Sequence, residues 1–152
     1  MARIEKKSPP GISGEAARKL LQQAQLRCTA TRIAVLQHLA TATQPISHSD
    51  VADGLSQSGF DKSTLFRSLV DLADAGLLTR LDLGDQVRRY ELRRGDTSKS
   101  KTDWVTEEHP HFVCVDCGRV TCLFEVSVSV PVPRSVGRVT EVLLRGHCAQ
   151  CS

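Results

Sequence analysis

The sequence predicts an α+β protein with an N-terminal winged helix-turn-helix and a small C-terminal α/β domain that is mostly β. Three observations support this fold class. Helical periodicity fills residues 15–75, a hairpin pattern follows directly, and two Cys-x-x-Cys pairs lie among short strand patterns after residue 110. With 152 residues, the chain is long enough for two small domains in tandem.

Changes in composition predict the domain boundaries. We expect a flexible tail over residues 1–14, a winged-helix domain over 15–92, a hinge over 93–108 and a cysteine-containing domain over 109–152. The first 34 residues contain seven Lys and Arg against two Glu, a charge balance that suits contact with phosphates. A solvated tail accounts equally well for the charges of its first 14 residues.

Three helices are predicted between residues 15 and 58. Helical spacing begins near Glu15, and the Gln25–Cys28 segment interrupts it. Thr29 or Thr31 can cap the second helix and Ser47 the third, because their side-chain oxygens accept hydrogen bonds from the first turn. The expected core positions are Ala17, Leu20, Leu21, Ala24, Ile33, Leu36, Leu39, Ala40, Val51, Ala52 and Leu55, and Gly59 is expected to close the third helix.

A fourth helix over residues 63–75 would be the recognition helix. Asp61 or Ser63 can cap its start, and Gly76 stops it as a C-terminal glycine does. Two strand patterns, 77–81 and 87–92, follow it. A helix-turn-helix with a hairpin behind it is typical of DNA-binding domains whose recognition helix enters the major groove. Its apolar stripe consists of Leu65, Leu69 and Leu72.

The polar face of this helix carries the candidates for DNA contact. Arg67 can contact a base or a phosphate, and Phe66 can meet a thymine methyl group. The alternative is a three-helix core whose polar face is simply solvated. The other candidates are Ser63 and Thr64 on the helix, with Arg80, Arg88 and Arg89 on the hairpin for the DNA backbone.

Two Cys-x-x-Cys pairs are the strongest chemical signal, Cys114 with Cys117 and Cys148 with Cys151. Two such pairs make the tetrahedral four-sulfur shell that zinc prefers, and four thiolates leave no open position for a substrate, so the predicted zinc is structural. Disulfides or a redox pair are the alternative, although paired cysteines in a reducing compartment are more often metal ligands. We interpret Cys28 as a small buried residue.

A second group of possible metal ligands surrounds His109 and His111. Residues two apart in an extended segment point the same way, so both imidazoles can share one metal. Glu91 and Cys122 are candidate further ligands. The alternative is a pair of surface histidines beside a linker. A mixed imidazole and thiolate site suits zinc better than magnesium, calcium or manganese.

Other functional classes find little support. No His-x-Glu pattern of a zinc deaminase, paired carboxylates or activated nucleophile is present, so we do not expect an enzyme. No apolar run approaches the roughly 18 residues of a membrane span, and the N-terminus lacks a secretory signal, so we expect a cytoplasmic protein. A zinc-ribbon module that binds protein stays an alternative.

The order of these features resembles the ferric uptake regulator family of metal-dependent repressors. The resemblance rests on four segments and covers about residues 15–152. They are Asp74-Ala75-Gly76-Leu77-Leu78, Tyr90-Glu91-Leu92, His109-Pro110-His111-Phe112-Val113-Cys114-Val115-Asp116-Cys117-Gly118 and Arg145-Gly146-His147-Cys148-Ala149-Gln150-Cys151.

The resemblance implies a homodimer on a palindromic DNA operator, joined through the C-terminal domain. It implies a regulatory metal, Zn²⁺ or Fe²⁺, at a hinge site matched by Glu91, His109 and His111, beside the structural Zn²⁺. It also matches Arg27 to a basic residue near the minor groove, and residues 63–67 to the recognition-helix motif, where Tyr usually stands in place of Phe66.

Several departures bear on the sensed metal. Pro45 stands where the family usually has a histidine ligand, with His48 three residues later as a possible substitute, and Cys122 stands where many members carry an acid. These residues favour zinc sensing, while iron, nickel or peroxide sensing, or loss of the regulatory metal, stay open. Residues 126–132 and 139–144 are predicted to be strands, with no convincing helix between the cysteine pairs.

Overall fold

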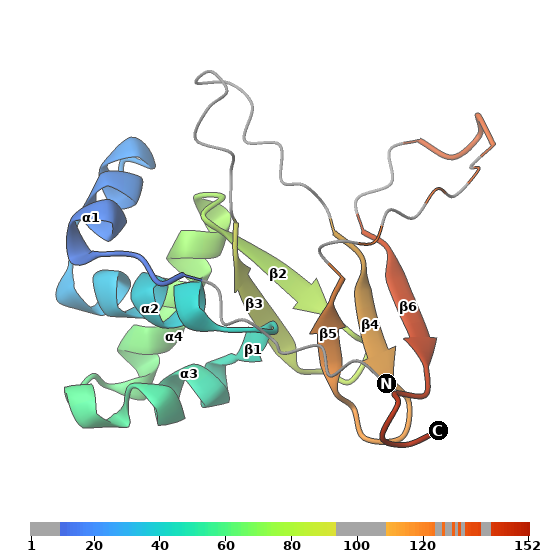
Figure 1. The fold of residues 1–152 in the computed structure, drawn as a ribbon. Coiled ribbons are helices and arrows are strands. Elements are labelled where there is room, and N and C mark those ends of the chain that lie inside the picture. Colours follow the sequence, from blue (N-terminus) through green and yellow to red (C-terminus); the bar gives the residue numbers. More distant parts are fainter. Residues whose placement is uncertain are drawn as a thin grey trace. The chain divides into compact units, whose positions relative to one another are not determined.

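A computed structural model describes residues 10–93, 109–123, 126, 129, 131, 133–137 and 141–152. The chain divides into two compact units, residues 1–93 and 94–152 (Figure 1). The expected tail and hinge fall mostly outside the described residues. None of the described helices is long and apolar enough to cross a membrane.

The first two helices of unit 1 are capped by hydroxyl side chains. Helix α1, Gly14–Gln23, begins one residue before the expected start because the Ser13 side chain accepts a hydrogen bond from the backbone N–H of Ala16. Helix α2, Ala30–Thr41, begins after Thr29, which confirms that cap over Thr31. Between them, Gln25 has a positive φ of 58°, which breaks the helical path as predicted.

The third helix is shorter than predicted. Helix α3, His48–Gly54, begins with a capping box in which Ser47 and Asp50 exchange hydrogen bonds. The prediction that Gly59 closes this helix is wrong: a separate 3₁₀ turn, Ser56–Ser58, follows, and Gly59 ends that turn with a φ of +70°. The Cβ of any other residue at position 54 would lie 2.3 Å from the His38 ring, so glycine allows α2 and α3 to approach closely.

Helix α4 and a small sheet complete unit 1. Helix α4, Lys62–Asp74, is capped by Asp61, and Gly76 follows it with a φ of +80°. Strands β2, Leu78–Asp82, and β3, Arg88–Leu92, form the predicted hairpin. The two-residue strand β1, Ile46–Ser47, was not predicted, and it pairs antiparallel with β3 to give the order β1-β3-β2.

One hydrophobic core joins the helices and the sheet of unit 1. It contains nearly all the predicted apolar positions, including Leu21, Leu36 and the full Leu65, Leu69 and Leu72 stripe of α4. Ile33 is only partly buried, and Val35 occupies the core instead. The prediction that Cys28 is buried is wrong, because it lies exposed in the turn after α1 with its thiol directed at the carbonyl of Arg18, 3.7 Å away.

Unit 2 contains a second three-stranded sheet in the order β5-β4-β6. Strand β4, His111–Cys114, pairs antiparallel with β5, Val120–Cys122, and parallel with β6, Leu143–Gly146. The described part of this unit has no helix.

Two strand predictions in this unit were inaccurate. The strand predicted over 139–144 begins only at Leu143, where pairing with His111 begins, and extends to Gly146. Between 126 and 132, the described residues Val126, Ser129 and Pro131 belong to no strand, and the other four positions of that prediction lie outside the described residues. Proline lacks the N–H that a sheet ladder requires, which opposes the β-propensity of the valines there.

Candidate metal centres and nucleic-acid interface

The structure gathers the four predicted zinc ligands into one group. The sulfur atoms of Cys114, Cys117, Cys148 and Cys151 all lie within 4.8 Å of one another. The sulfurs of Cys117 and Cys148 are 3.9 Å apart, too far for a disulfide, whose bond is about 2.05 Å long. Tetrahedral zinc with bonds of about 2.3 Å places its sulfur ligands about 3.8 Å apart. The thiols therefore fit a structural zinc.

The sheet of unit 2 brings the two cysteine pairs together. Cys114 ends β4, and the turn behind it is closed by a hydrogen bond of 3.0 Å from the N–H of Gly118, whose φ is +69°. Cys148 comes two residues after β6, and the N–H of Cys151 donates to its carbonyl. Because β4 and β6 run parallel, with Cys114 opposite Gly146, both turns leave the same end of the sheet.

Electrostatics at this group favour one thiolate but not four. The backbone N–H of Cys117, followed by that of Cys148 at 3.3 Å from the sulfur, lowers the pKa of Cys114 to about 6. The side chains of Cys148 and Cys117 raise the pKa of Cys151 to about 12. Full deprotonation of the group therefore calls for the charge of a divalent cation at its centre.

A hydrogen bond outside the four sulfurs links the two turns. Asp116 lies inside the first cysteine pair, and its carboxylate is 2.6 Å from Nδ1 of His147, which directly precedes the second pair. This contact was not predicted from the sequence. The sequence did carry a signal for it, because an acid lies within one cysteine pair and a histidine directly precedes the other. Side chains that do not bind the metal commonly hydrogen-bond around a metal site and hold its ligands in place.

A second group of ligands forms where β4 meets β5. The antiparallel register places Cys122 directly opposite His111, and His109 lies two residues before His111. The two imidazole centroids are 4.6 Å apart, with ring planes inclined by 55°. The ligating atoms of His109, His111 and Cys122 lie within 4.8 Å of one another, and His111 is only 5% exposed. Two imidazoles and a thiol fit a second divalent metal.

Glu91 and His48, the candidate ligands from the helix-turn-helix part of the chain, belong to unit 1. Glu91 is half-buried in β3, opposite Thr79. Because it belongs to a different unit from the two histidines and Cys122, its role as a metal ligand stays a prediction. His48 faces its own unit: its Nε2 lies 3.0 Å from the carbonyl of Lys62, and its ring packs edge-on against Phe66 at 5.3 Å. Pro45 is buried.

The start of α4 presents the predicted DNA-contacting residues. The Asp61 carboxylate accepts from the N–H groups of Ser63 and Thr64 and from the Ser63 hydroxyl, which lowers the pKa of Asp61. Ser63 is thus engaged in capping. Thr64 and Arg67 are exposed, and Phe66 is 42% exposed although it is large and apolar. An exposed aromatic ring and an exposed guanidinium at neighbouring positions can both contact the edges of DNA bases.

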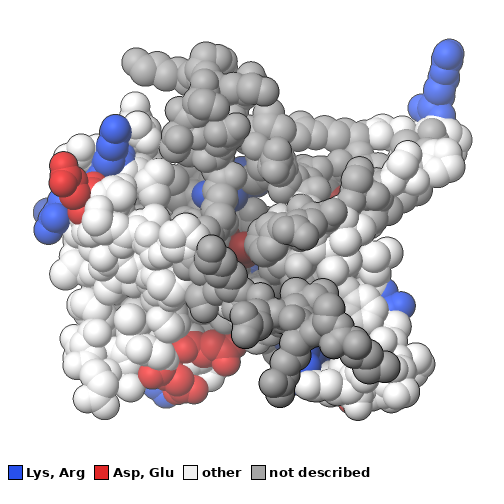
Figure 2. Space-filling model, viewed as in Figure 1, with Lys and Arg blue, Asp and Glu red and all other residues white. Residues whose placement is uncertain are grey.

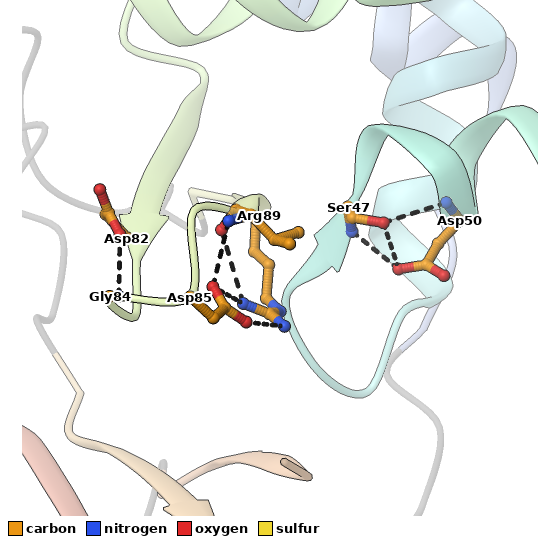
Figure 3. Close-up of polar contacts among 7 residues, drawn as sticks. Ser47, Asp50, Asp82, Gly84, Asp85 and Arg89 are labelled. Carbon is orange, nitrogen blue, oxygen red and sulfur yellow. Dashed lines mark hydrogen bonds and ion pairs between the residues drawn. The ribbon is translucent and has the colours of Figure 1, made fainter.

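Some of the basic residues of unit 1 form ion pairs with neighbouring acids. Arg80 pairs with Asp74 at 3.4 Å, and Arg89 binds both carboxylate oxygens of Asp85 (Figure 3). On the face shown in Figure 2, the few blue areas on the described surface of unit 1 adjoin red ones and form no continuous basic patch.

Arg27 is exposed, as a groove contact requires, and its backbone is held in place. Its carbonyl accepts a hydrogen bond of 3.0 Å from the Arg32 guanidinium. The same guanidinium pairs with Asp71 of α4 at 2.6 Å. This bridge was not predicted from the sequence, because nothing in the spacing of the three residues indicates that they meet.

Comparison with known proteins decides the family. The profile of the Ferric uptake regulator family matches residues 23–131. The ferric uptake regulation protein of Legionella pneumophila is 35% identical over 140 residues, which is 86% of this chain and 95% of that protein. The chain belongs to the ferric uptake regulator family. Members of this family are metal-responsive transcriptional regulators rather than enzymes.

Solved structures of family members share the fold. The ferric uptake regulator of Vibrio cholerae superposes with a TM-score of 0.61 at 23% identity, covering 86% of this chain and 98% of that one. A zinc uptake regulator complexed with zinc and DNA gives a TM-score of 0.56 at 20% identity, over 90% of this chain and 91% of that chain. At these identities the likeness shows the α+β fold, which confirms the predicted fold class.

Proposed function

We propose that this member of the ferric uptake regulator family is a zinc-responsive repressor that binds a palindromic DNA operator as a homodimer. The observation that carries the proposal is the group of His109, His111 and Cys122 at the junction of β4 and β5. Borderline-soft zinc accepts imidazole and thiolate together, whereas harder ions prefer oxygen ligands. Glu91 is proposed as a fourth ligand.

The two metal groups would have separate roles. The four thiolates of the cysteine group would fill every position of a tetrahedral ion, so that zinc would stabilise unit 2. The group of two histidines and one cysteine would exchange its ion with the surroundings. Binding there would bias the protein towards the form that holds DNA tightly, since a ligand shifts a population only through unequal affinity for two states.

The DNA contacts would come from unit 1. The start of α4 would enter the major groove, where Arg67 would hydrogen-bond to a base or a phosphate and Phe66 would meet a thymine methyl group. Thr64 and Ser63 would lie near the backbone, and Arg27 would approach the minor groove. Such a regulator would act where the bacterial DNA lies, in the cytoplasm.

Metal analysis with a DNA-binding assay tests the proposal. Zinc per chain is measured by elemental analysis before and after mild chelation, and DNA affinity is measured by fluorescence anisotropy on a duplex selected from a random library. We expect two zinc ions per chain, one of which is lost easily together with tight DNA binding. Restoration by Fe²⁺ but not by Zn²⁺ would instead identify an iron or peroxide sensor.

Substitution of the cysteine ligand separates zinc from harder metals. In Cys122→Asp an oxygen ligand replaces sulfur, so we expect zinc affinity to fall by at least tenfold relative to Mn²⁺ affinity. Cys28→Ser is the matched control, because Cys28 is exposed and lies in unit 1. A wild-type protein that binds no duplex with any metal would leave a protein-binding zinc module as the better description.

A further inference from the structure

An open pocket of about 490 Å³ lies on unit 1, where the start of α3, helix α4 and strand β3 meet. Phe66 of α4 contributes to its wall, next in sequence to Arg67. The opposite wall comes from the hairpin, through Gln86 and Arg88. The pocket thus adjoins the surface proposed to read DNA, yet neither the comparisons nor the metal groups assign it a role.

The pocket lining offers hydrogen-bond donors and one positive charge. Besides Gln86 and Arg88 it includes Ser49 and His48, and none of its lining residues is an acid. The Nε2 atom of His48 is engaged with the Lys62 carbonyl. Within the described part of the chain, the side chains of Ser49, Gln86 and Arg88 form no hydrogen bond or ion pair, and all three residues are exposed. Such a set suits a small oxyanion.

Arg88 differs from the other two arginines of the hairpin. Arg80 and Arg89 are each neutralised by an aspartate, at 3.4 Å and 2.7 Å. Adjacent residues of a strand point to opposite faces, so Arg88 and Arg89 are directed apart although they are neighbours. Of these three cations, only Arg88 both lines the pocket and lacks an acidic partner among the described residues.

Asp50 of α3, next in sequence to the pocket residue Ser49, is an acid whose carboxylate is already hydrogen-bonded. Asp50 accepts hydrogen bonds from the hydroxyl and the backbone N–H of Ser47, at 2.7 and 2.9 Å (Figure 3). These hydrogen bonds, together with the charge of Arg89, lower the pKa of Asp50 despite its partial burial. On β2, Asp82 lies opposite Arg88 in the hairpin register and accepts a hydrogen bond from the N–H of Gly84. Among the described residues neither Asp50 nor Asp82 forms an ion pair with Arg88, so the charge of Arg88 is available to an incoming anion.

We propose that this pocket binds one phosphate of the DNA backbone. Arg88 supplies the charge, and Ser49 and Gln86 supply neutral hydrogen bonds, while Phe66 extends from the same site towards the bases. A phosphate held here fixes how far α4 enters the major groove, because backbone contacts set the register of a protein on its duplex. This inference rests on the proposed DNA-binding function and adds a defined contact to it.

The salt dependence of DNA affinity tests the pocket directly. Each neutralised phosphate contributes about 0.9 to the slope of log affinity against log salt. Arg88→Gln should therefore reduce the magnitude of the slope by about 0.9 per bound subunit, with similar losses on a selected and a scrambled duplex. Arg119→Gln removes the same charge from an exposed position in unit 2, and we expect it to leave the slope within about 0.3 of wild type. Thermal melting confirms that both variants are folded.

Further variants and inorganic phosphate distinguish the remaining outcomes. Arg88→Lys should retain the slope, and Ser49→Ala should weaken both duplexes alike without changing it. An unchanged slope in Arg88→Gln, or an equal fall in Arg119→Gln, overturns the pocket while the DNA-binding function stands. Chemical shifts of Arg88 and Ser49 that respond to inorganic phosphate, combined with an unchanged DNA slope, would assign the pocket to a free anion instead. Absence of any wild-type DNA binding overturns the proposed function itself.

Discussion

The guanidinium of Arg32 joins the turn before α2 to the recognition helix, so its removal should destabilise unit 1. It donates to the Arg27 carbonyl at 3.0 Å and pairs with Asp71 at 2.6 Å, with side chains 17% and 46% exposed, respectively. A hydrogen bond to a charged group contributes about 1.5–3 kcal/mol when protected from water. Because Asp71 is nearly half exposed, we discount the pair and expect Arg32→Met to lose about 1–2 kcal/mol in total.

Thermal and chemical unfolding of unit 1 provide the assay. For a domain of this size, a loss of 1 kcal/mol lowers Tm by about 4–8 °C. A double-mutant cycle with Asp71→Asn should give a coupling of about 0.5–1.5 kcal/mol, since the two residues are in direct contact. Arg32→Lys keeps the charge but cannot span both acceptors, so it should recover only part of the loss. A coupling near zero, or an Arg32→Met variant as stable as wild type, would refute the bridge.

Three further predictions concern the zinc, the recognition helix and its cap. Cys148→Ser should release the structural zinc and unfold unit 2, measured by elemental analysis and near-UV circular dichroism, whereas Cys28→Ser should retain the metal; a Cys148→Ser protein that melts like wild type would contradict a structural ion. Arg67→Ala should cost about 1–3 kcal/mol of binding on the selected duplex and less on random DNA, and equal losses on both would identify a phosphate contact instead. Hydrogen bonds from Ser63 and Thr64 lower the pKa of Asp61, so the stability that this cap contributes is present above the unfolded pKa near 3.8 and is lost as the pH falls through the folded value. Asp61→Asn keeps a capping oxygen and should remove this acid dependence of helix content. An unchanged profile of helix content against pH would refute the role of Asp61 as the titrating cap.

Local patterns were sufficient for most of unit 1. Thr29, Ser47 and Asp61 cap their helices, and the Leu65, Leu69 and Leu72 stripe is buried, because capping and amphipathicity depend on residues within one or two turns. The prediction erred at the end of α3, where Gly54 lies close to the His38 ring of another helix. The misjudged burial of Cys28 has the same origin, since exposure depends on what packs over a turn.

The amino-acid sequence by itself predicted the four-thiolate zinc site, since the spacing within each cysteine pair directs two sulfurs towards one point, and the four sulfurs do gather. It also determined the order of helices and hairpin, and with it the family. Only the tertiary structure decided that Cys122 lies opposite His111, because strand register is a long-range property that a shift of one residue would reverse. It alone decided that Arg32 bridges Arg27 and Asp71, and that Arg88 lines a pocket while its neighbour is paired. Such contacts depend on how separate elements pack, which no local spacing records.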